Sequence, residues 1–346
     1  MSNKRTELNQ LGEFGLIKKI AESVVIRQKS TTKGIGDDAA SIKPEGEVVI
    51  SSDMLMEGIH FDLSYMPIHH LGYKAVAVNV SDIAAMNATP TQIIVNIGLS
   101  NRFSLEAIEA LYEGINAACE QYKVDLVGGD TSSSASGLAI SITAVGMASK
   151  TKLAYRSGAK KGDILCATGD LGAAYVGLQV LEREKQVFAS NPNMQPDLEK
   201  YQYIVQKQLK PEARMDVIHE LADLNIVPTS MIDISDGLAS EILHLQEHSG
   251  IGFRIYEDKL PIDKMTYDTA VEFNLDPITC ILNGGEDYEL LFTIPQDDYE
   301  KVKHHPDIHF IGYALDNKED SHLVTKNQNM VTLKAQGFNH LSKSDM

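Results

Sequence analysis

The sequence mixes two hydrophobic periodicities, and this mixture constrains the fold more than any other feature. From Leu138 to Met147, apolar residues alternate with small polar ones, which predicts a half-buried strand. From Ser104 to Tyr122, apolar residues recur at helical spacing, and Ser104 is placed to cap that helix. Both halves of the chain contain segments of each kind, without the regular alternation of a doubly wound sheet. We therefore expect an α+β fold in each half.

The same two patterns predict further elements. Residues 48–52 predict a short buried strand, and residues 72–87 have the apolar spacing of a helix. A helix is expected to end at Gly250, because glycine commonly closes helices. Residues 185–205 are polar and contain two prolines, so we expect an excursion there. The remaining strand predictions are residues 92–98, 163–167, a segment that ends at Ile232, 252–256, 288–294 and 308–313.

Length and composition predict two domains. A chain of 346 residues is long enough for about two domains of roughly 150 residues. Near residue 150 the pattern restarts, because a basic, loop-like segment, SKTKLAYRSGAKKGD, leads into a new strand. We expect an N-terminal domain over residues 1–150 and a C-terminal domain over residues 151–346.

Charge and cysteine content exclude several classes of protein. The chain has 31 Lys and Arg against 48 Asp and Glu, a net charge of −17, which argues against nucleic acid or an anionic membrane surface as a partner. Its three cysteines are widely spaced and form no CxxC pair, so neither a zinc ribbon nor a disulfide framework is indicated. Neither a signal peptide nor an apolar run of about 18 residues is visible, so we expect a cytoplasmic protein.

Acidic residues gather beside Gly, Ser or Thr, often at the ends of predicted strands. Mg²⁺ prefers oxygen ligands and is usually held by a few carboxylates together with substrate phosphates. A single Asp-Gly or Gly-Asp is more often a turn than a ligand, so the pattern alone leaves turns and a metal–phosphate site both open. The segments are Gly36-Asp37-Asp38-Ala39, Ser51-Ser52-Asp53, Asn79-Val80-Ser81-Asp82, Gly128-Gly129-Asp130-Thr131, Asp233-Ile234-Ser235-Asp236-Gly237 and Gly284-Gly285-Glu286-Asp287.

Two of these segments carry specific alternatives. Asp233 and Asp236 stand three residues apart, directly before a predicted helix, and helix capping explains one of the two carboxylates but not both. Asp82 falls inside a helical pattern, where a solvated surface position explains it as well as metal binding does.

Several common catalytic motifs are missing from the sequence. It contains no P-loop, no HRD or DFG motif of protein kinases and no HExxH motif. The segment from Gly169 to Gly172 resembles half of a glycine-rich loop but lacks the dinucleotide-binding spacing. No arrangement of His with Asp or of Cys with His suggests a strong general base.

The motifs together resemble those of the thiamine-monophosphate kinases. This family belongs to a superfamily with aminoimidazole ribonucleotide synthetase, selenophosphate synthetase and a hydrogenase maturation protein. The resemblance extends over about residues 10–340. It rests on GIGDDAA, ISSDMLMEGIHF, AVNVSDIAAMNATP, LVGGDT, RSGAKKGD, MIDISDGLASEILHLQEHSGIG and NGGEDYELLFTI, which occur in the family's order and spacing.

The resemblance implies two α+β domains, the C-terminal one an α/β sandwich, and a homodimer in which the N-terminal domains pair their sheets. It implies that the N-terminal domain binds ATP and metal and that the C-terminal domain completes the ATP, metal and substrate site. Glu241 departs from the family pattern, since Asp is frequent there.

The resemblance also implies a role for each matching residue. Several Mg²⁺ ions would be bound by Asp37, Ser51, Ser52, Asp53, Asp82, Asp130, Asp233 and Asp236. ATP would be contacted by Gly129, Asp130, Arg156, Ser235 and Tyr112, and thiamine monophosphate by His60, Glu286 and Phe338. The residues implied to act in catalysis are Asp130, Asp233, Asp236 and Arg156.

The implied reaction is the direct transfer of phosphate from ATP, the co-substrate, to thiamine monophosphate, which gives thiamine diphosphate. The acceptor is a phosphate oxygen, so no strong general base is needed. Two alternatives stay open: an ATP-dependent ligase like aminoimidazole ribonucleotide synthetase, and a non-catalytic protein of the same fold that binds nucleotide or metal.

Overall fold

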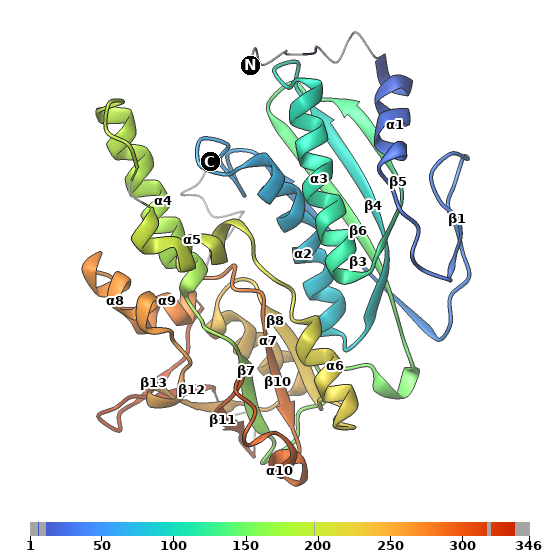
Figure 1. Ribbon diagram of the computed structural model, residues 1–346. Coiled ribbons are helices and arrows are strands. Elements are labelled where there is room, and N and C mark those ends of the chain that lie inside the picture. The colour runs from blue at the N-terminus through green and yellow to red at the C-terminus, as the bar shows by residue number, and fades with distance from the viewer. Residues whose placement is uncertain (1–5, 7–11, 197, 317–319, 336–346) are drawn as a thin grey trace. The chain divides into compact units, whose positions relative to one another are not determined.

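The chain folds into two compact units, each with its own sheet. The structure, a computed structural model, describes residues 6, 12–196, 198–316 and 320–335. The first unit comprises Met1–Ala84 and Ala88–Lys152, and the second comprises Ala85–Asn87 and Leu153–Met346. Helices and strands occur in both units (Figure 1), so the expectation of an α+β fold is confirmed.

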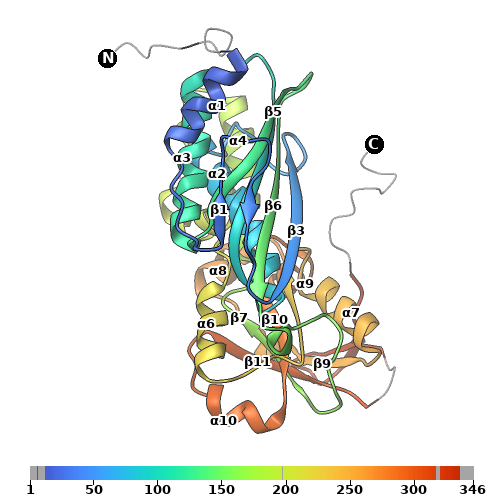
Figure 2. The ribbon, with the colours of Figure 1, turned by 90° about the vertical axis from the view of Figure 1, so that its right-hand side faces the viewer.

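The first unit is a four-stranded sheet with helices on one face (Figure 2). The strand order is β3-β6-β4-β5, in which β4 pairs with β5 in parallel and with β6 in antiparallel orientation. The strands are β3 (Glu47–Met56), β4 (Thr89–Leu99), β5 (Asp125–Ser133) and β6 (Leu138–Ala148). The other elements are α1 (Gly12–Glu22), the paired β1 (Thr31–Lys33) and β2 (Ser41–Ile42), α2 (Ile68–Ala85), α3 (Leu105–Tyr122) and the 3₁₀ helix η2 (Lys150–Lys152).

Local sequence signals explain these elements. In β6, Leu138, Ile140 and Ile142 are buried while the residues between them are half-buried, as the alternation predicts. Ser104 caps α3 by accepting a hydrogen bond from the backbone N–H of Ala107 at 3.4 Å. The left-handed conformation of Lys123 ends that helix. The predicted strand over 92–98 and the predicted helix over 72–87 are also confirmed.

A strand over residues 48–52 is confirmed, but the prediction that it is short and buried is wrong. The strand β3 has ten residues, and its alternate side chains are exposed, among them Ile50 at 68% and Met54 at 55%. The physical reason is its place in the sheet: β3 is an edge strand, and Figure 2 shows no helix of the first unit on the sheet face opposite α2 and α3.

The second unit is built on a seven-stranded sheet of order β13-β12-β9-β11-β7-β10-β8. Its pairs are antiparallel except for β9 with β12. The strands are β7 (Ile164–Thr168), β8 (Ser230–Ile234), β9 (Phe253–Tyr256), β10 (Glu289–Ile294), β11 (Ile308–Ala314), β12 (His322–Val324) and β13 (Met330–Thr332). The strand predictions over 163–167, 252–256, 288–294 and 308–313, and the one ending near Ile232, are confirmed.

Seven α-helices are described in the second unit. The helix α7 ends at Gly250, as expected, and its apolar residues Leu238, Ile242 and Leu245 pack on the sheet in one core with Ile232 and Leu291. The helices are α4 (Ala173–Ser190), α5 (Gln202–Leu209), α6 (Met215–Asp223), α7 (Leu238–Ser249), α8 (Lys264–Glu272), α9 (Pro277–Asn283) and α10 (Tyr299–Val302), with 3₁₀ helices η3 (Glu199–Tyr201), η4 (Glu257–Lys259) and η5 (Gln296–Asp298).

The expected excursion over residues 185–205 is mostly helical instead. Its first residues form the last turns of α4, and its last residues form η3 and the start of α5. Because α4 and α5 pack against each other, tertiary contact stabilises helices that the polar sequence does not suggest.

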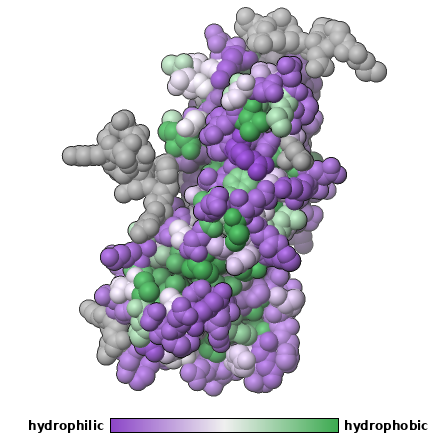
Figure 3. Space-filling view, turned by 90° about the vertical axis from the view of Figure 1, so that its left-hand side faces the viewer, coloured by the Kyte–Doolittle hydropathy of each residue, from purple (hydrophilic) through white to green (hydrophobic). Residues whose placement is uncertain are grey.

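One face of the molecule is largely polar (Figure 3). On this face hydrophilic side chains predominate and apolar side chains gather mainly in the lower part of Figure 3. Among the residues that the structure describes, no helix has the length and apolar character needed to span a membrane.

A buried ion pair ties the second unit together. The guanidinium of Arg214 contacts the carboxylate of Glu289 at 2.6 Å, and the Lys207 ammonium contacts the same carboxylate at 3.2 Å. The hydroxyl of Thr168 donates to it at 2.7 Å. The Glu289 side chain is only 2% exposed, so its charge depends on these partners.

Arg214→Ala should therefore lower the free energy of unfolding by about 3–5 kcal/mol, because it leaves Glu289 buried and only partly compensated. The control is Lys264→Ala, which removes an exposed i,i+4 ion pair with Asp268 and should leave stability almost unchanged. Urea unfolding followed by circular dichroism measures both. Equal effects of the two substitutions would contradict this role of Arg214.

Candidate functional site

The turn between β8 and α7 places two carboxylates of the second unit. Asp233 lies in β8 and is buried, whereas Asp236 follows the strand and is exposed. Gly237 has a φ of 105°, and a side chain there would collide with the backbone of Leu282 and Asn283. Glycine is thus required for the chain to turn from the strand into the helix.

A second loop, residues 284–288, is held against this turn. The backbone N–H of Glu286 donates to the carbonyl of Ser235 at 2.7 Å, and that of Tyr288 donates to Ile234 at 2.9 Å. Glu286 and Tyr288 both have positive φ, a strained conformation for residues other than glycine. The Glu286 carboxylate accepts a hydrogen bond from the Gln208 side-chain amide at 2.7 Å. Ser235, Asp236 and Glu286 are therefore brought onto adjoining loops.

Glu241 of α7 links the carboxylates electrostatically. It accepts a hydrogen bond from the backbone N–H of Asp236 at 3.1 Å and is only 2% exposed. Burial, then the charges of Asp233 and Asp236, raise the pKa of Glu241 to about 8, while the charge of Arg156 lowers it. The structure thus brings Asp233, Asp236 and Arg156 into one electrostatic group around Glu241.

Arg156 is positioned by backbone contacts on both sides. The carbonyl of the preceding residue, Tyr155, accepts from the N–H of Met231 in β8 at 2.9 Å. The carbonyl of Arg156 itself accepts from the hydroxyl of Ser249, the last residue of α7, at 3.1 Å. The side chain is exposed, so its guanidinium can reach a bound anion.

The glycine-rich segment 169–172 has a structural role. A side chain at Gly169 would meet the carboxylate of Glu289 at 2.2 Å. The backbone N–H groups of Gly172 and Ala174 donate to the buried carboxylate of Asp287 at 2.8 and 3.3 Å, which fixes the start of α4. These contacts hold the loop 284–288 against the segment 169–172. The glycines of the segment thus have a structural explanation that does not involve nucleotide binding.

In the first unit, a pair of carboxylates lies between β3 and α2. The hydroxyl of Ser51 donates to Asp82, and the backbone N–H of Asp53 donates to the Asn79 side chain at 3.1 Å. Burial, then the charge and hydrogen bonding of Asp82, raise the pKa of Asp53 to about 6. Asp82 is half-buried beside Asp53, which favours the functional interpretation of this helix position over a solvated one.

Ser52 points to the opposite face of β3. Its hydroxyl bonds to Thr143 at 2.9 Å and to the carbonyl of Ile142 at 3.2 Å. The side chains of Ser51 and Ser52 thus lie on opposite faces of the sheet, and of the two only Ser51 contacts the Asp53–Asp82 pair.

Asp130 lies on the other edge of this sheet. Across the sheet, Asp53 of β3 pairs with Ile142 of β6, Ile142 pairs with Val95 of β4, and Val95 pairs with Gly129 of β5. The edge strands β3 and β5 are therefore three strand spacings apart, roughly 14 Å. Asp130 is exposed and occupies the adjacent row of the register. At Gly129 a Cβ would lie 1.9 Å from the carbonyl oxygen of Val95, so glycine is required there. Asp53 and Asp130 of one chain are therefore separate groups.

The other residues predicted for the first unit lie apart from one another. Asp37 is exposed on the loop after β1, and its carboxylate lies 3.9 Å from the ammonium of Lys33. The strand β1 itself contacts β5 (Figure 1). Tyr112 of α3 lines a groove of about 350 Å³ between α1 and α3, and burial raises its pKa. His60 follows β3, and its Nδ1 accepts from the backbone N–H of Met56 at 3.0 Å, which leaves Nε2–H as a donor.

Some of these roles were hidden in the sequence. Phe338, the predicted aromatic contact, lies outside the described residues. Asn79, Gln208 and Glu241 were not predicted to act at the site, although the spacing of Asn79 and Asp82, one turn apart on a helix, could have indicated the first of them.

Glu241 generates a prediction about pH. The pKa of the Glu241 carboxyl is raised from 4.5 to about 8 in the folded state. This group therefore lowers the free energy of unfolding of the protein as pH rises between these two values, by up to about 1.4 kcal/mol per pH unit. Glu241→Gln keeps a carbonyl oxygen for the Asp236 N–H and removes the charge. In chelator, its melting temperature should exceed the wild-type value at pH 8 by more than at pH 5. An advantage that is the same at both pH values would contradict the raised pKa.

Comparisons with known proteins connect this chain to a family. The family described as AIR synthase related protein, N-terminal domain, matches residues 36–148. The thiamine-monophosphate kinase of Bacillus subtilis is 33% identical over 342 residues, which is 95% of this chain and 99% of that protein. The thiamine-monophosphate kinase of Aquifex aeolicus is 34% identical over 84% of this chain and 88% of that protein.

Solved structures agree. AaThiL complexed with AMPPCP and TMP has a TM-score of 0.75 at 30% identity and covers 98% of this chain and 100% of that chain. The thiamine-monophosphate kinase of Stenotrophomonas maltophilia has a TM-score of 0.76, also at 30% identity, over 90% of this chain and 96% of that one. The hydrogenase maturation protein HypE, at 16% identity and a TM-score of 0.74, shares the fold. The chain belongs to the thiamine-monophosphate kinase family.

Proposed function

We propose that this protein transfers a phosphoryl group from ATP to thiamine monophosphate in the presence of Mg²⁺ and so forms thiamine diphosphate. The observation that carries the proposal is the pairing of two loops in the second unit, which sets Ser235 and Asp236 beside Glu286. Relatives that match nearly the whole chain are named for this activity, and the solved structure of AaThiL holds AMPPCP and TMP.

The carboxylates fit divalent cations. Burial, then the charge of Asp82, raises the pKa of Asp53, so ionising both carboxylates is unfavourable without a counter-charge, and a hard cation between them would supply it. In the second unit, burial and the charges of Asp233 and Asp236 likewise raise the pKa of Glu241, and a cation bound by the two aspartates would offset their charges. We propose that these residues, with Ser51, Asp130 and Asp37, hold Mg²⁺. Bound Mg²⁺ would neutralise phosphate charge and so reduce the repulsion between ATP and the acceptor.

The chain's own groups bind and orient the two substrates. Arg156 offers a planar set of donors to phosphate oxygens. Gly129 is proposed to contact the nucleotide through its backbone beside Asp130. The Nε2–H of His60 and the carboxylate of Glu286 are proposed to recognise thiamine monophosphate. Because the acceptor oxygen is already largely deprotonated at neutral pH, no residue has to remove a proton from it.

Asp236→Asn tests this assignment directly. Turnover should fall by about 10²–10³-fold at saturating Mg²⁺, because the substitution removes a carboxylate proposed to hold the Mg²⁺ that stabilises the charge of the transition state. The assay incubates the protein with ATP, Mg²⁺ and thiamine monophosphate, and detects thiamine diphosphate as fluorescent thiochrome after oxidation.

The matched control is Asp297→Asn, an exposed aspartate in η5, which should keep wild-type turnover. If the wild-type protein forms no thiamine diphosphate with any of several divalent metals, the proposed activity is wrong. If Asp236→Asn keeps full turnover while the wild type is active, only the role of Asp236 is wrong.

We also propose that the protein is a homodimer that pairs through β3. This edge strand pairs with β6 on one side and with no described strand on the other, and it exposes a stripe of apolar side chains on the face that no described helix of the first unit covers. The stripe consists of Val48, Ile50, Met54 and Met56, with exposed fractions of 41%, 68%, 55% and 41%.

Ile50→Asp should convert the dimer into a monomer, because it would bury a charge in the apolar interface. Size-exclusion chromatography with light scattering measures the mass. The control Val331→Asp changes an exposed valine in β13, a strand of the second unit, and should leave the dimer intact. A wild-type protein that is monomeric at micromolar concentration would overturn the proposal.

The cytoplasm is the proposed compartment. The cysteines Cys119, Cys166 and Cys280 are all buried and none forms a disulfide, which agrees with a reducing environment.

A further inference from the structure

The last turns of α7 carry a cluster of metal-binding side chains outside the proposed active site. We propose that His244, Glu247 and His248 bind one transition-metal dication of the Zn²⁺ class. This inference does not depend on the proposed function, because none of the three residues belongs to the carboxylate groups described above.

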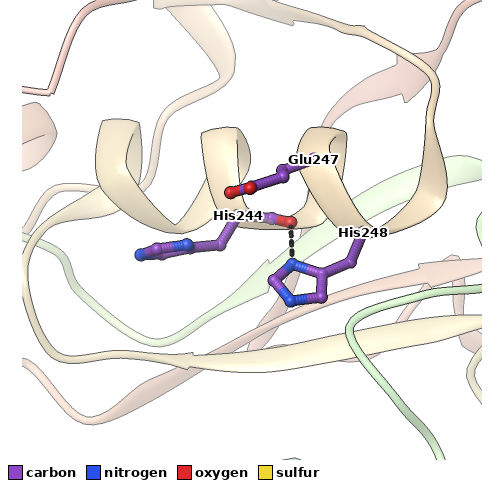
Figure 4. A group of neighbouring side chains, drawn as sticks. All are labelled: His244, Glu247 and His248. Atoms are coloured by element: carbon purple, nitrogen blue, oxygen red, sulfur yellow. Dashed lines mark hydrogen bonds between the residues drawn. The ribbon is translucent and has the colours of Figure 1, made fainter.

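The spacing brings the three side chains together. Positions i, i+3 and i+4 of a helix are neighbours on its surface. One ligand atom of each residue lies within 4.8 Å of those of the other two, and Figure 4 shows the three side chains around the last turns of α7. Ligand atoms that share a tetrahedral Zn²⁺ lie about 3.4 Å apart. Side-chain rotation is enough to bring the three ligand atoms to this separation. Glu247 is exposed, so its side chain can rotate toward the two histidines.

A hydrogen bond fixes the tautomer of His248. Its Nδ1 lies 2.8 Å from the backbone carbonyl oxygen of His244 (Figure 4). A carbonyl oxygen can only accept, so Nδ1 carries the proton and Nε2 keeps its lone pair. Metal-binding histidines commonly donate their other ring N–H to a carbonyl or carboxylate in this way, which orients the ring. His248 is therefore already in the form that a metal ion requires.

The electrostatic setting favours a cation. His248 is the residue before the last of α7, and the C-terminal end of a helix carries a partial negative charge. Glu247 adds a full negative charge. Two imidazoles and one carboxylate suit Zn²⁺, Ni²⁺ or Cu²⁺, whereas Mg²⁺ prefers oxygen ligands only. The site thus differs in chemistry from the aspartate groups.

A metal ion at this position would link His244 and His248 across one turn and hold the end of α7 in helical form. That end is connected to the rest of the second unit, because Ser249 donates to the carbonyl of Arg156 and accepts from the backbone N–H of Ala159 at 3.3 Å. We therefore expect the ion to stabilise the folded protein.

Calorimetric titration of the full-length protein with Zn²⁺, in excess Mg²⁺, tests the proposal. The wild type should bind one ion per chain that Mg²⁺ does not displace. His248→Ala and His244→Ala should each weaken this binding by at least about tenfold, since even the loss of an outer partner of a ligand costs 10–100-fold. The control is His304→Ala, which changes an exposed histidine elsewhere in the second unit and should bind as the wild type does.

Thermal unfolding gives an independent readout. Zn²⁺ should raise the melting temperature of the wild type and of His304→Ala but not that of His248→Ala, and all three should melt alike in chelator. The proposal is overturned if His248→Ala and His304→Ala bind Zn²⁺ with equal affinity, or if Mg²⁺ displaces all of the bound Zn²⁺.

Discussion

Repulsion between closely held carboxylates is the constraint on which the site depends. Burial, then the charge of Asp82, raises the pKa of Asp53 in the first unit, and burial, then the charges of Asp233 and Asp236, raises that of Glu241 in the second. A fold that keeps such groups together without a cation loses stability, and a bound divalent cation turns the same arrangement into an attraction for phosphate. Our proposal thereby reconciles a net charge of −17 with an anionic substrate, because it assigns part of that charge to metal binding.

The scaffold holds these groups in place with backbone contacts that few residues can replace. Gly237 and Gly285 let two loops approach so closely that a Cβ at Gly285 would stand 2.6 Å from the carbonyl oxygen of Ser235. Asp287 and Glu289, on either side of Tyr288, anchor the second loop to the start of α4 and to Arg214. In our proposal Asp287 and Glu289 bind no ligand, and their role is to position the loop that carries Glu286.

Local signals in the sequence predicted much of the fold, and tertiary context determined the rest. The Ser104 cap and the alternation in β6 are encoded within a few residues, so they could be read directly. The exposure of β3 depends on its place at the sheet edge, and the helical end of α4 depends on α5, and neither partner is visible in the local pattern. The same is true of the site. Motif spacing singles out Asp233 and Asp236, but only the fold shows that Glu241 is buried near both and that Asp53 lies on a different edge strand from Asp130.

The central claim is that metal ions make an acidic site attractive to a nucleotide. Its most direct test is the affinity for ATP, measured by calorimetry with the full-length protein at a series of free Mg²⁺ concentrations and in chelator. The account predicts that ATP binding rises steeply with Mg²⁺ and is lost in chelator, because the empty carboxylate groups repel the triphosphate. Tight ATP binding in chelator would contradict it.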